Sequence, residues 1–170
     1  IDISGKTDRI SYYFSGGYNR QNGMFKYGND IYNRYNLRTK LQFKLTDWWS
    51  LNSNVSLTTS DYDYANAMTN TYKQMYRKNP MDMVKNPDGT WTDASVGTLG
   101  GLAEGGRATD WKTNTNINLS TKIDVIKDVF FVQGTFAFSN TKTRSNWYNL
   151  PVTYRNGPEL PVLTFNPIST

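Results

Sequence analysis

The amino-acid sequence predicts an all-β chain that forms part of a large antiparallel transmembrane β-barrel. Three observations favour this fold: about five long segments alternate apolar with polar residues, short connections alternate with long ones, and aromatic residues reach 15% of the 170 residues although hydrophobic residues make up only 37%. Alternation with a period of two places apolar side chains on one face of a strand and polar side chains on the other. No apolar run approaches the roughly 18–20 residues of a transmembrane helix.

The clearest alternation lies between Ile31 and Leu45, where odd positions are mostly apolar and even positions are polar or amphipathic. This segment exceeds the roughly 9–11 residues with which a tilted strand crosses the hydrocarbon. A Lys or Arg side chain that faces lipid at the bilayer midplane costs about 2–4 kcal/mol. We therefore expect the even positions to face the barrel lumen, namely Arg34, Asn36, Arg38, Lys40 and Gln42. The odd positions Tyr35, Leu37, Leu41 and Phe43 are expected to face lipid.

Four further segments alternate in the same way, at 9–19, 51–58, 114–123 and 130–139. The polar sides of the third and fourth strands are rich in amides, which both donate and accept hydrogen bonds. Such side chains suit hydrated oligosaccharides or peptides, although any water-filled or plugged lumen also needs polar side chains. The expected lumen-facing amides are Asn52, Asn54, Asn114, Asn116 and Asn118.

The connections between the strands predict the domain organisation, because barrels have short turns at one rim and longer loops at the other. We expect three barrel strands at 1–59, a long extracellular loop at 60–110, two barrel strands at 111–140 and a further extracellular loop at 141–170. Trp48 and Trp49 lie in a short turn, where membrane-interface aromatics are expected.

The long loop contains a helical stripe in which Ala65, Met68 and Tyr72 recur at helical spacing. Asp63 is the expected N-cap of a short helix, and Asn79-Pro80 is its expected end. Asn86-Pro87-Asp88-Gly89 predicts a turn, and the glycine-rich stretch 97–106 predicts a mobile segment.

Four aromatic residues of the expected external loop are candidates for contact with a substrate or a partner protein: Tyr62, Tyr64, Trp91 and Trp111. Their rings could stack on sugars, or they could instead hold the loop together.

The composition excludes most familiar enzyme chemistry, because the chain contains neither histidine nor cysteine. Without them there is no Ser-His-Asp or Cys-His nucleophile, no His/Cys zinc site and no disulfide. The pair Asp61 and Asp63 lacks the further ligands of a calcium loop. The net charge is +5, but the basic residues are scattered, which argues against a nucleic-acid partner. We expect no enzyme activity, no catalytic residues, no metal and no cofactor.

Several short motifs follow one another along the chain: Tyr12-Tyr13-Phe14-Ser15-Gly16-Gly17-Tyr18, Gln21-Asn22-Gly23, Arg34-Tyr35-Asn36-Leu37-Arg38 and Thr46-Asp47-Trp48, then Asn79-Pro80 and Asp88-Gly89-Thr90. In order and spacing these motifs resemble the SusC/RagA family of TonB-dependent outer-membrane transporters. The resemblance covers the first ninety residues or so; the strands at 111–140 share only the pattern.

This resemblance implies a segment of a nutrient importer in the bacterial outer membrane, which takes up oligosaccharides or peptides. The implied partners are a SusD-like surface lipoprotein, the TonB complex, outer-membrane lipid and the glycan or peptide substrate. Family barrels have ~22 strands around a plug, and open sheet edges are not tolerated in lipid. We therefore expect a plug domain and the remaining barrel strands outside this chain.

Two alternatives remain open at this stage. A passive porin or structural outer-membrane barrel would share the strand pattern but not the energy coupling. A soluble β-rich carbohydrate-binding module would be a sandwich with one buried face, although sandwich strands are shorter and turns recur every 8–12 residues or so.

Overall fold

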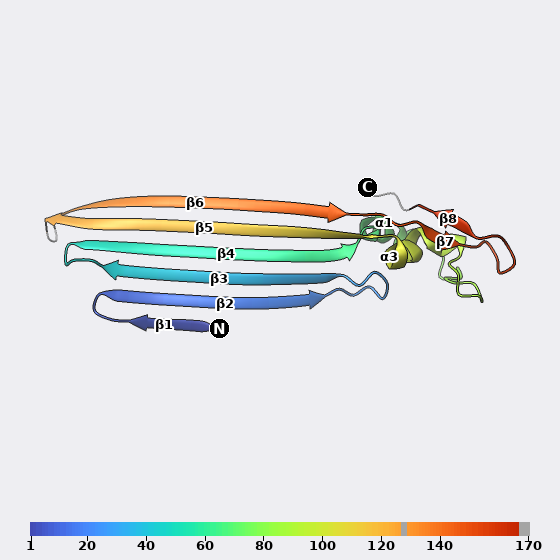
Figure 1. Cartoon of the computed structure of the whole chain (residues 1–170), viewed down its shortest axis with the longest axis horizontal. Coiled ribbons are helices and arrows are strands. Elements are labelled where there is room, and N and C mark those ends of the chain that lie inside the picture. The colour runs from blue at the N-terminus through green and yellow to red at the C-terminus, as the bar shows by residue number, and fades with distance from the viewer. Residues whose placement is uncertain (127–128, 167–170) are drawn as a thin grey trace. The chain divides into compact units, whose positions relative to one another are not determined.

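A computed structural model describes residues 1–126 and 129–166. It confirms the all-β prediction: the main element is a six-stranded antiparallel sheet in which the strands are neighbours in chain order (Figure 1). Its strands are β1 (Asp2–Lys6), β2 (Ile10–Asn22), β3 (Ile31–Lys44), β4 (Trp49–Ala65), β5 (Arg107–Ile126) and β6 (Phe130–Trp147). Within the described residues this sheet does not close, because β1 and β6 each have one neighbour.

The register of the first pair shows how the pattern builds the sheet. Ile3 pairs with Phe14 and Ser4 with Tyr13. Directly opposed residues project to the same face of an antiparallel pair, so the apolar residues of β1 and β2 share one face and the polar residues share the other. The pattern therefore sets the register, since a slip of one residue would invert both strands.

The chain divides into two compact units, which we describe separately. Unit 1 comprises Ile1–Arg20, Asn33–Asp61 and Trp111–Arg144, and unit 2 comprises Gln21–Tyr32, Tyr62–Asp110 and Ser145–Thr170. The short turn 45–48 lies in unit 1, where the amide of Leu45 donates to the carbonyl of Trp49 at 2.9 Å. The long connection between β4 and β5 lies in unit 2.

Unit 2 has a hydrophobic core of its own. Trp91, Val96 and Val152 form its centre, and Tyr27, Leu99, Tyr154 and Phe165 pack against them. The strands β7 (Val152–Tyr154) and β8 (Leu163–Phe165) pair antiparallel beside this core. The remaining elements are short: α1 (Met68–Gln74), η1 (Met75–Arg77), α2 (Asp93–Ser95), η2 (Val96–Gly100) and α3 (Gly101–Glu104).

The glycine-rich stretch is helical rather than an extended flexible loop, because η2 and α3 occupy most of it. A Cβ atom on Gly100 would lie 3.3 Å from the ring of Trp91, and one on Gly101 would lie 3.2 Å from Ala67. Gly106 ends the stretch with φ of 108°, and a Cβ there would clash with the carbonyl oxygen of Tyr148. Gly106 is therefore required by its backbone conformation and by close packing, whereas Gly100 and Gly101 are in tight contact with their neighbours.

Several expected boundaries differ from the structure. β4 continues to Ala65 and β5 begins at Arg107, so the expected loop 60–110 is shorter at both ends. β6 continues to Trp147, so the expected loop 141–170 begins within a strand. The strands are longer than expected because their ends mix apolar and polar residues on the same face, so the alternation that predicts a strand is interrupted there.

The short helix also begins later than expected. Asp63 lies in β4 and pairs with Arg107, so it is not an N-cap; the helix α1 begins after Ala67. Its buried residue is Thr71, whereas Tyr72 of the expected apolar stripe is 71% exposed. The turn at Asn86–Gly89 is confirmed, with the amide of Gly89 donating to the carbonyl of Asn86 at 2.9 Å and φ of 84° at Gly89.

Among the described residues, no helix has the length and apolar character needed to cross a bilayer.

Candidate functional site

The polar face of the sheet in unit 1 is built by cross-strand hydrogen bonds. Arg38 donates to Asn54 at 3.5 Å, and Thr58 donates to Asn36 at 3.1 Å. These two hydrogen bonds join β3 to β4. Because side chains alternate along a strand, these bonds place the even-numbered residues of both strands on one face.

The same face continues onto β5 and β6. Ser139 donates to Asn116 at 2.7 Å, and Thr141 donates to Asn114 at 2.9 Å. The strand alternation thus places all ten predicted lumen-facing residues on one face: Arg34, Asn36, Arg38, Lys40, Gln42, Asn52, Asn54, Asn114, Asn116 and Asn118. That this face lines a lumen stays a prediction.

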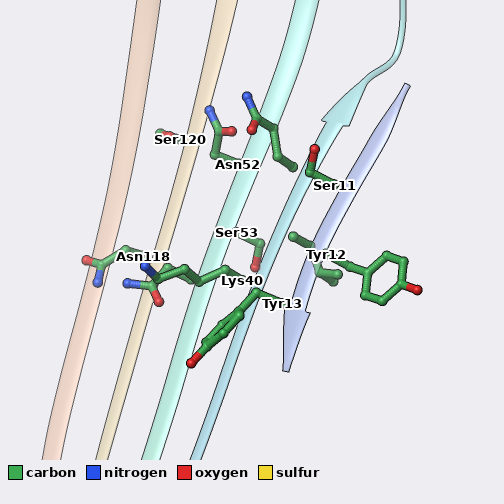
Figure 2. A pocket seen from close by; sticks show the side chains of 11 residues that line it. Ser11, Tyr12, Tyr13, Lys40, Asn52, Ser53, Asn118 and Ser120 are labelled. Atoms are coloured by element: carbon green, nitrogen blue, oxygen red, sulfur yellow. The ribbon is translucent and has the colours of Figure 1, made fainter. Parts of the chain in front are cut away.

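A pocket of about 380 Å³ lies on this polar face (Figure 2). Figure 2 shows Lys40 extending in the direction of Asn118, while the consecutive residues Tyr12 and Tyr13 project to different sides of β2. The ammonium of Lys40 also lies 5.9 Å from the ring centroid of Tyr13. Lys40 is the sole charged residue of the lining, and the other polar lining residues are amides, hydroxyls and tyrosines. Such a lining offers donors and acceptors to a hydrated, uncharged or anionic solute.

The opposite face of unit 1 is apolar and exposed. Phe14 is 41% exposed, Leu37 is 52% exposed and Phe136 is 58% exposed. Tyr18 and Tyr35 contact each other on this face, with ring centroids 5.0 Å apart. Large exposed apolar patches are typical of surfaces that contact a membrane or another protein.

Trp48 and Trp49 lie at the short turn between β3 and β4, as the sequence predicts. Their rings stack with centroids 6.2 Å apart, and the Nε1–H of Trp49 donates to Thr121 Oγ1 at 2.8 Å. Both rings stay partly exposed, at 52% for Trp48 and 37% for Trp49. This pair has the amphipathic character of interfacial aromatics, and its position at a membrane interface stays a prediction.

In unit 2, Tyr62 and Tyr64 lie in β4 rather than in a loop, and their rings stack with centroids 4.7 Å apart. The hydroxyl of Tyr62 donates to Asp30 at 3.3 Å, and that of Tyr64 donates to Asp110 at 3.2 Å. The carboxylates therefore fix the orientation of both rings.

The other two aromatic candidates are corrected by the structure. Trp91 is 3% exposed and forms the centre of the unit 2 core, with its Nε1–H donating to Glu104 at 2.9 Å. Its ring is therefore unavailable to a substrate or partner. Trp111 lies in β5, not in an external loop, and its ring lies 5.9 Å from the guanidinium of Arg144.

Two ion pairs hold segments of unit 2 together. Arg107 pairs with Asp63 at 3.0 Å and also donates to the carbonyl of Asn29 at 2.9 Å. Arg155 pairs with Asp88 at 3.0 Å. Hydrogen bonds from the side chain and backbone of Thr90, with a smaller contribution from Arg155, hold the pKa of Asp88 below its usual value.

A second groove, of about 420 Å³, lies in unit 2. Tyr64 of β4, Asp110 of β5 and Trp147 of β6 line it, together with Asn66, Ala108, Ser145 and Asn146. Neither Asp110 nor Trp147 is among the candidate residues that the sequence predicts. Continuing the alternation of β6 through Thr141, Thr143 and Ser145 would have placed Trp147 on the polar face.

Across residues 1–126 and 129–166, no group of three or more Asp, Glu, His or Cys side chains is placed to hold a metal ion. Comparison with known proteins gave no match to any family model, any curated protein or any solved structure.

Proposed function

We propose that this chain is a segment of an outer-membrane, TonB-dependent nutrient importer that resembles SusC. Its strands cross the bilayer with the apolar face of unit 1 toward lipid and the polar face toward a water-filled or plugged lumen. In this proposal a SusD-like lipoprotein assists the uptake of oligosaccharides or peptides.

The observation that carries the proposal is the apolar face of unit 1, which lies on strands of unusual length. β2 to β6 contain 13, 14, 17, 20 and 18 residues, whereas soluble strands usually have about 5–6 and a bilayer crossing needs about 9–11. Among the described residues of unit 1, no hydrophobic side chain is buried. A soluble sandwich would bury this face against a second sheet, so this observation disfavours the soluble carbohydrate-binding module.

The open edges of the sheet favour a larger barrel. β1 and β6 each lack a second neighbour among the described strands, and unpaired backbone groups at membrane depth cost several kcal/mol each. Further strands, outside this chain, would pair these edges, and a plug domain with a TonB box would couple uptake to energy.

Unit 2 supplies a surface that suits a partner protein. Tyr76 is 75% exposed, Met81 is 86% exposed and Met83 is 61% exposed. Methionine adapts its shape to a partner, and tyrosine adds contact area at low entropic cost. In our proposal these residues contact the lipoprotein.

Energised uptake tests the proposal against a passive porin. Cells that express the full-length protein are given a mixture of oligosaccharides and peptides, and depletion is followed by mass spectrometry with and without collapse of the proton-motive force. We expect the protein in the outer-membrane fraction, co-purification of a lipoprotein, and uptake that stops on collapse. Uptake that continues unchanged would favour the porin, and a protein found outside the membrane fraction would exclude both.

A further inference from the structure

The groove of unit 2 brings together two aromatic side chains and a carboxylate from three neighbouring strands, and Asn66 and Asn146 also line it. β4, β5 and β6 are adjacent in the sheet, and they contribute Tyr64, Asp110 and Trp147 to the lining of this groove. Two backbone hydrogen bonds show which residues of the three strands lie opposite one another. The backbone amide of Asn66 donates to the carbonyl of Gly106 at 3.2 Å, and the backbone amide of Tyr148 donates to the carbonyl of Arg107 at 3.0 Å.

These hydrogen bonds place the small residue Ala108 between Tyr64 and Trp147. Ala108 is 4% exposed and lines the groove, so it forms a floor between two larger rings. Neighbouring strands lie about 4.8 Å apart, which separates the two aromatic positions by roughly 10 Å across β5. This spacing leaves room for a flat ligand over Ala108 with an aromatic ring on either side.

The polar groups have fixed positions around this floor. The hydroxyl of Tyr64 donates to Asp110 Oδ2 at 3.2 Å, which orients the carboxylate within the groove. An ionised carboxylate is an acceptor with several lone pairs, so Asp110 can also accept from ligand hydroxyls. The side-chain amide of Asn66 donates to the side-chain oxygen of Asn149, which fixes the position of a second polar group at the rim of the groove.

The charge of the groove selects among ligands. None of its seven lining residues is basic, and its one charged residue is Asp110. Burying an anionic ligand beside the carboxylate of Asp110 would be repulsive, so uronic acids, phosphates and acidic peptides are disfavoured. Pyranose rings present apolar C–H faces to aromatic rings and hydroxyl donors to a carboxylate, and pockets that bind such ligands combine aromatic walls with a few fixed polar groups.

We infer that this groove is a subsite for a neutral oligosaccharide, with Tyr64 and Trp147 as the stacking walls and Asp110 as the acceptor of its hydroxyl groups. The inference rests on the proposed function for the route by which the sugar reaches the groove, and it selects glycan over peptide as the substrate class.

The test is calorimetric titration of the detergent-solubilised full-length protein with neutral hexasaccharides of α-1,4-glucose, β-1,4-glucose, β-1,3-glucose and α-1,6-mannose. A hexamer of α-1,4-galacturonic acid and a hexapeptide of alanine serve as comparison ligands. We expect at least one neutral hexasaccharide to bind, and we expect Trp147→Ala and Asp110→Asn each to weaken that binding about tenfold. The control is Trp111→Ala, because Trp111 follows Asp110 in β5 and therefore projects to the opposite face.

A separate titration of Tyr64→Phe distinguishes the effect of stacking on the Tyr64 ring from the effect of orienting the Asp110 carboxylate. This variant keeps the ring but loses the hydrogen bond to Asp110, so we expect a smaller loss than in Trp147→Ala. The inference is overturned if no neutral hexasaccharide binds, if binding is equal in the Trp147 and Trp111 variants, or if the galacturonic acid or alanine hexamer binds more tightly than every neutral sugar. If one of these results occurs while single cysteines in β3 are still labelled at alternate positions, as a membrane strand requires, the subsite is rejected and the proposed function stands.

Discussion

Unit 2 buries its hydrophobic residues, whereas unit 1 exposes them. All seven buried hydrophobic residues of the described chain belong to unit 2: Ala65, Ala67, Trp91, Val96, Leu102, Ala108 and Val152. Unit 1 contains the longest amphipathic strands, yet its phenylalanines and leucines stay accessible. One chain thus contains a region stabilised by its own core and a region whose apolar face requires an apolar environment. A mutation in unit 2 should therefore act through the packing of its own core, whereas a mutation on the apolar face of unit 1 should act through contact with the environment of that face.

The largest effect is expected in the core of unit 2. Trp91→Ala removes the ring that packs against Val96 and Val152, and truncation of a buried tryptophan costs about 3–5 kcal/mol. We expect the amides of α2, η2 and β7 to lose protection in hydrogen exchange of the full-length protein, while the strand segments of unit 1 keep theirs. Trp48→Ala, at an exposed position, is the matched control and should leave unit 2 protected. Equal exchange in both variants would show that Trp91 does not organise this core.

An intermediate effect is expected on the apolar face of unit 1. Phe136 and Thr135 are consecutive in β6, and their side chains project to opposite faces. Phe136→Arg places a charge toward lipid and should lower the free energy of unfolding by about 2–4 kcal/mol, whereas Thr135→Arg should change it by less than about 1 kcal/mol. The measurement is denaturant unfolding of the full-length protein in lipid vesicles. Equal losses in the two variants would remove the distinction between the faces.

The smallest effect is expected at Asp88, a surface residue of unit 2. Its carboxylate accepts from Thr90 Oγ1 at 2.6 Å and from the Thr90 amide at 3.0 Å, and these bonds lower its pKa. Because the folded pKa lies below the unfolded value, the stabilisation is present above the unfolded pKa and is lost as the pH falls through the folded pKa. The protection factor of the Thr90 amide, taken relative to the intrinsic exchange rate at each pH, should therefore fall in acid. Asp88→Asn should remove that acid dependence, and a dependence that persists would assign it to another carboxylate.

The strands of unit 1 were predictable because each face repeats one kind of residue. Between Ile31 and Lys44 the alternation alone separates Arg38 and Lys40 from Leu37 and Leu41. The end of β6 was not predictable from this criterion, because Lys142 and Arg144 share a face with Phe138 and interrupt its apolar character. The backbone pairing of β6 continues beyond its apolar stretch, where the side chains no longer show the alternation that identifies a strand.

The core of unit 2 was not predictable because its contacts are distant in sequence. Trp91 forms a cluster with Val152, Phe165 packs against that cluster, and no periodicity links these residues. An isolated tryptophan in a polar, glycine-containing segment is compatible with a surface contact or a core position. The groove lined by Tyr64, Asp110 and Trp147 was not predictable for the same reason, because the pairing of three strands brings residues together that are distant in sequence. Local pattern therefore sets faces within strands, whereas the core and the groove depend on the sheet order and loop packing.

Cysteine labelling of β3 tests the central claim that the polar and apolar faces meet water and lipid respectively. The chain contains no cysteine of its own, so single cysteines can be placed at each position from 34 to 43 in the full-length protein in its membrane. A bulky, water-soluble thiol reagent should label the even positions, which include Arg38 and Lys40, and should spare the odd positions, which include Leu37 and Leu41. Alternation over the whole series is the predicted result. Uniform labelling, or a reactivity period near that of a helix at about 3.6 residues, would contradict the account.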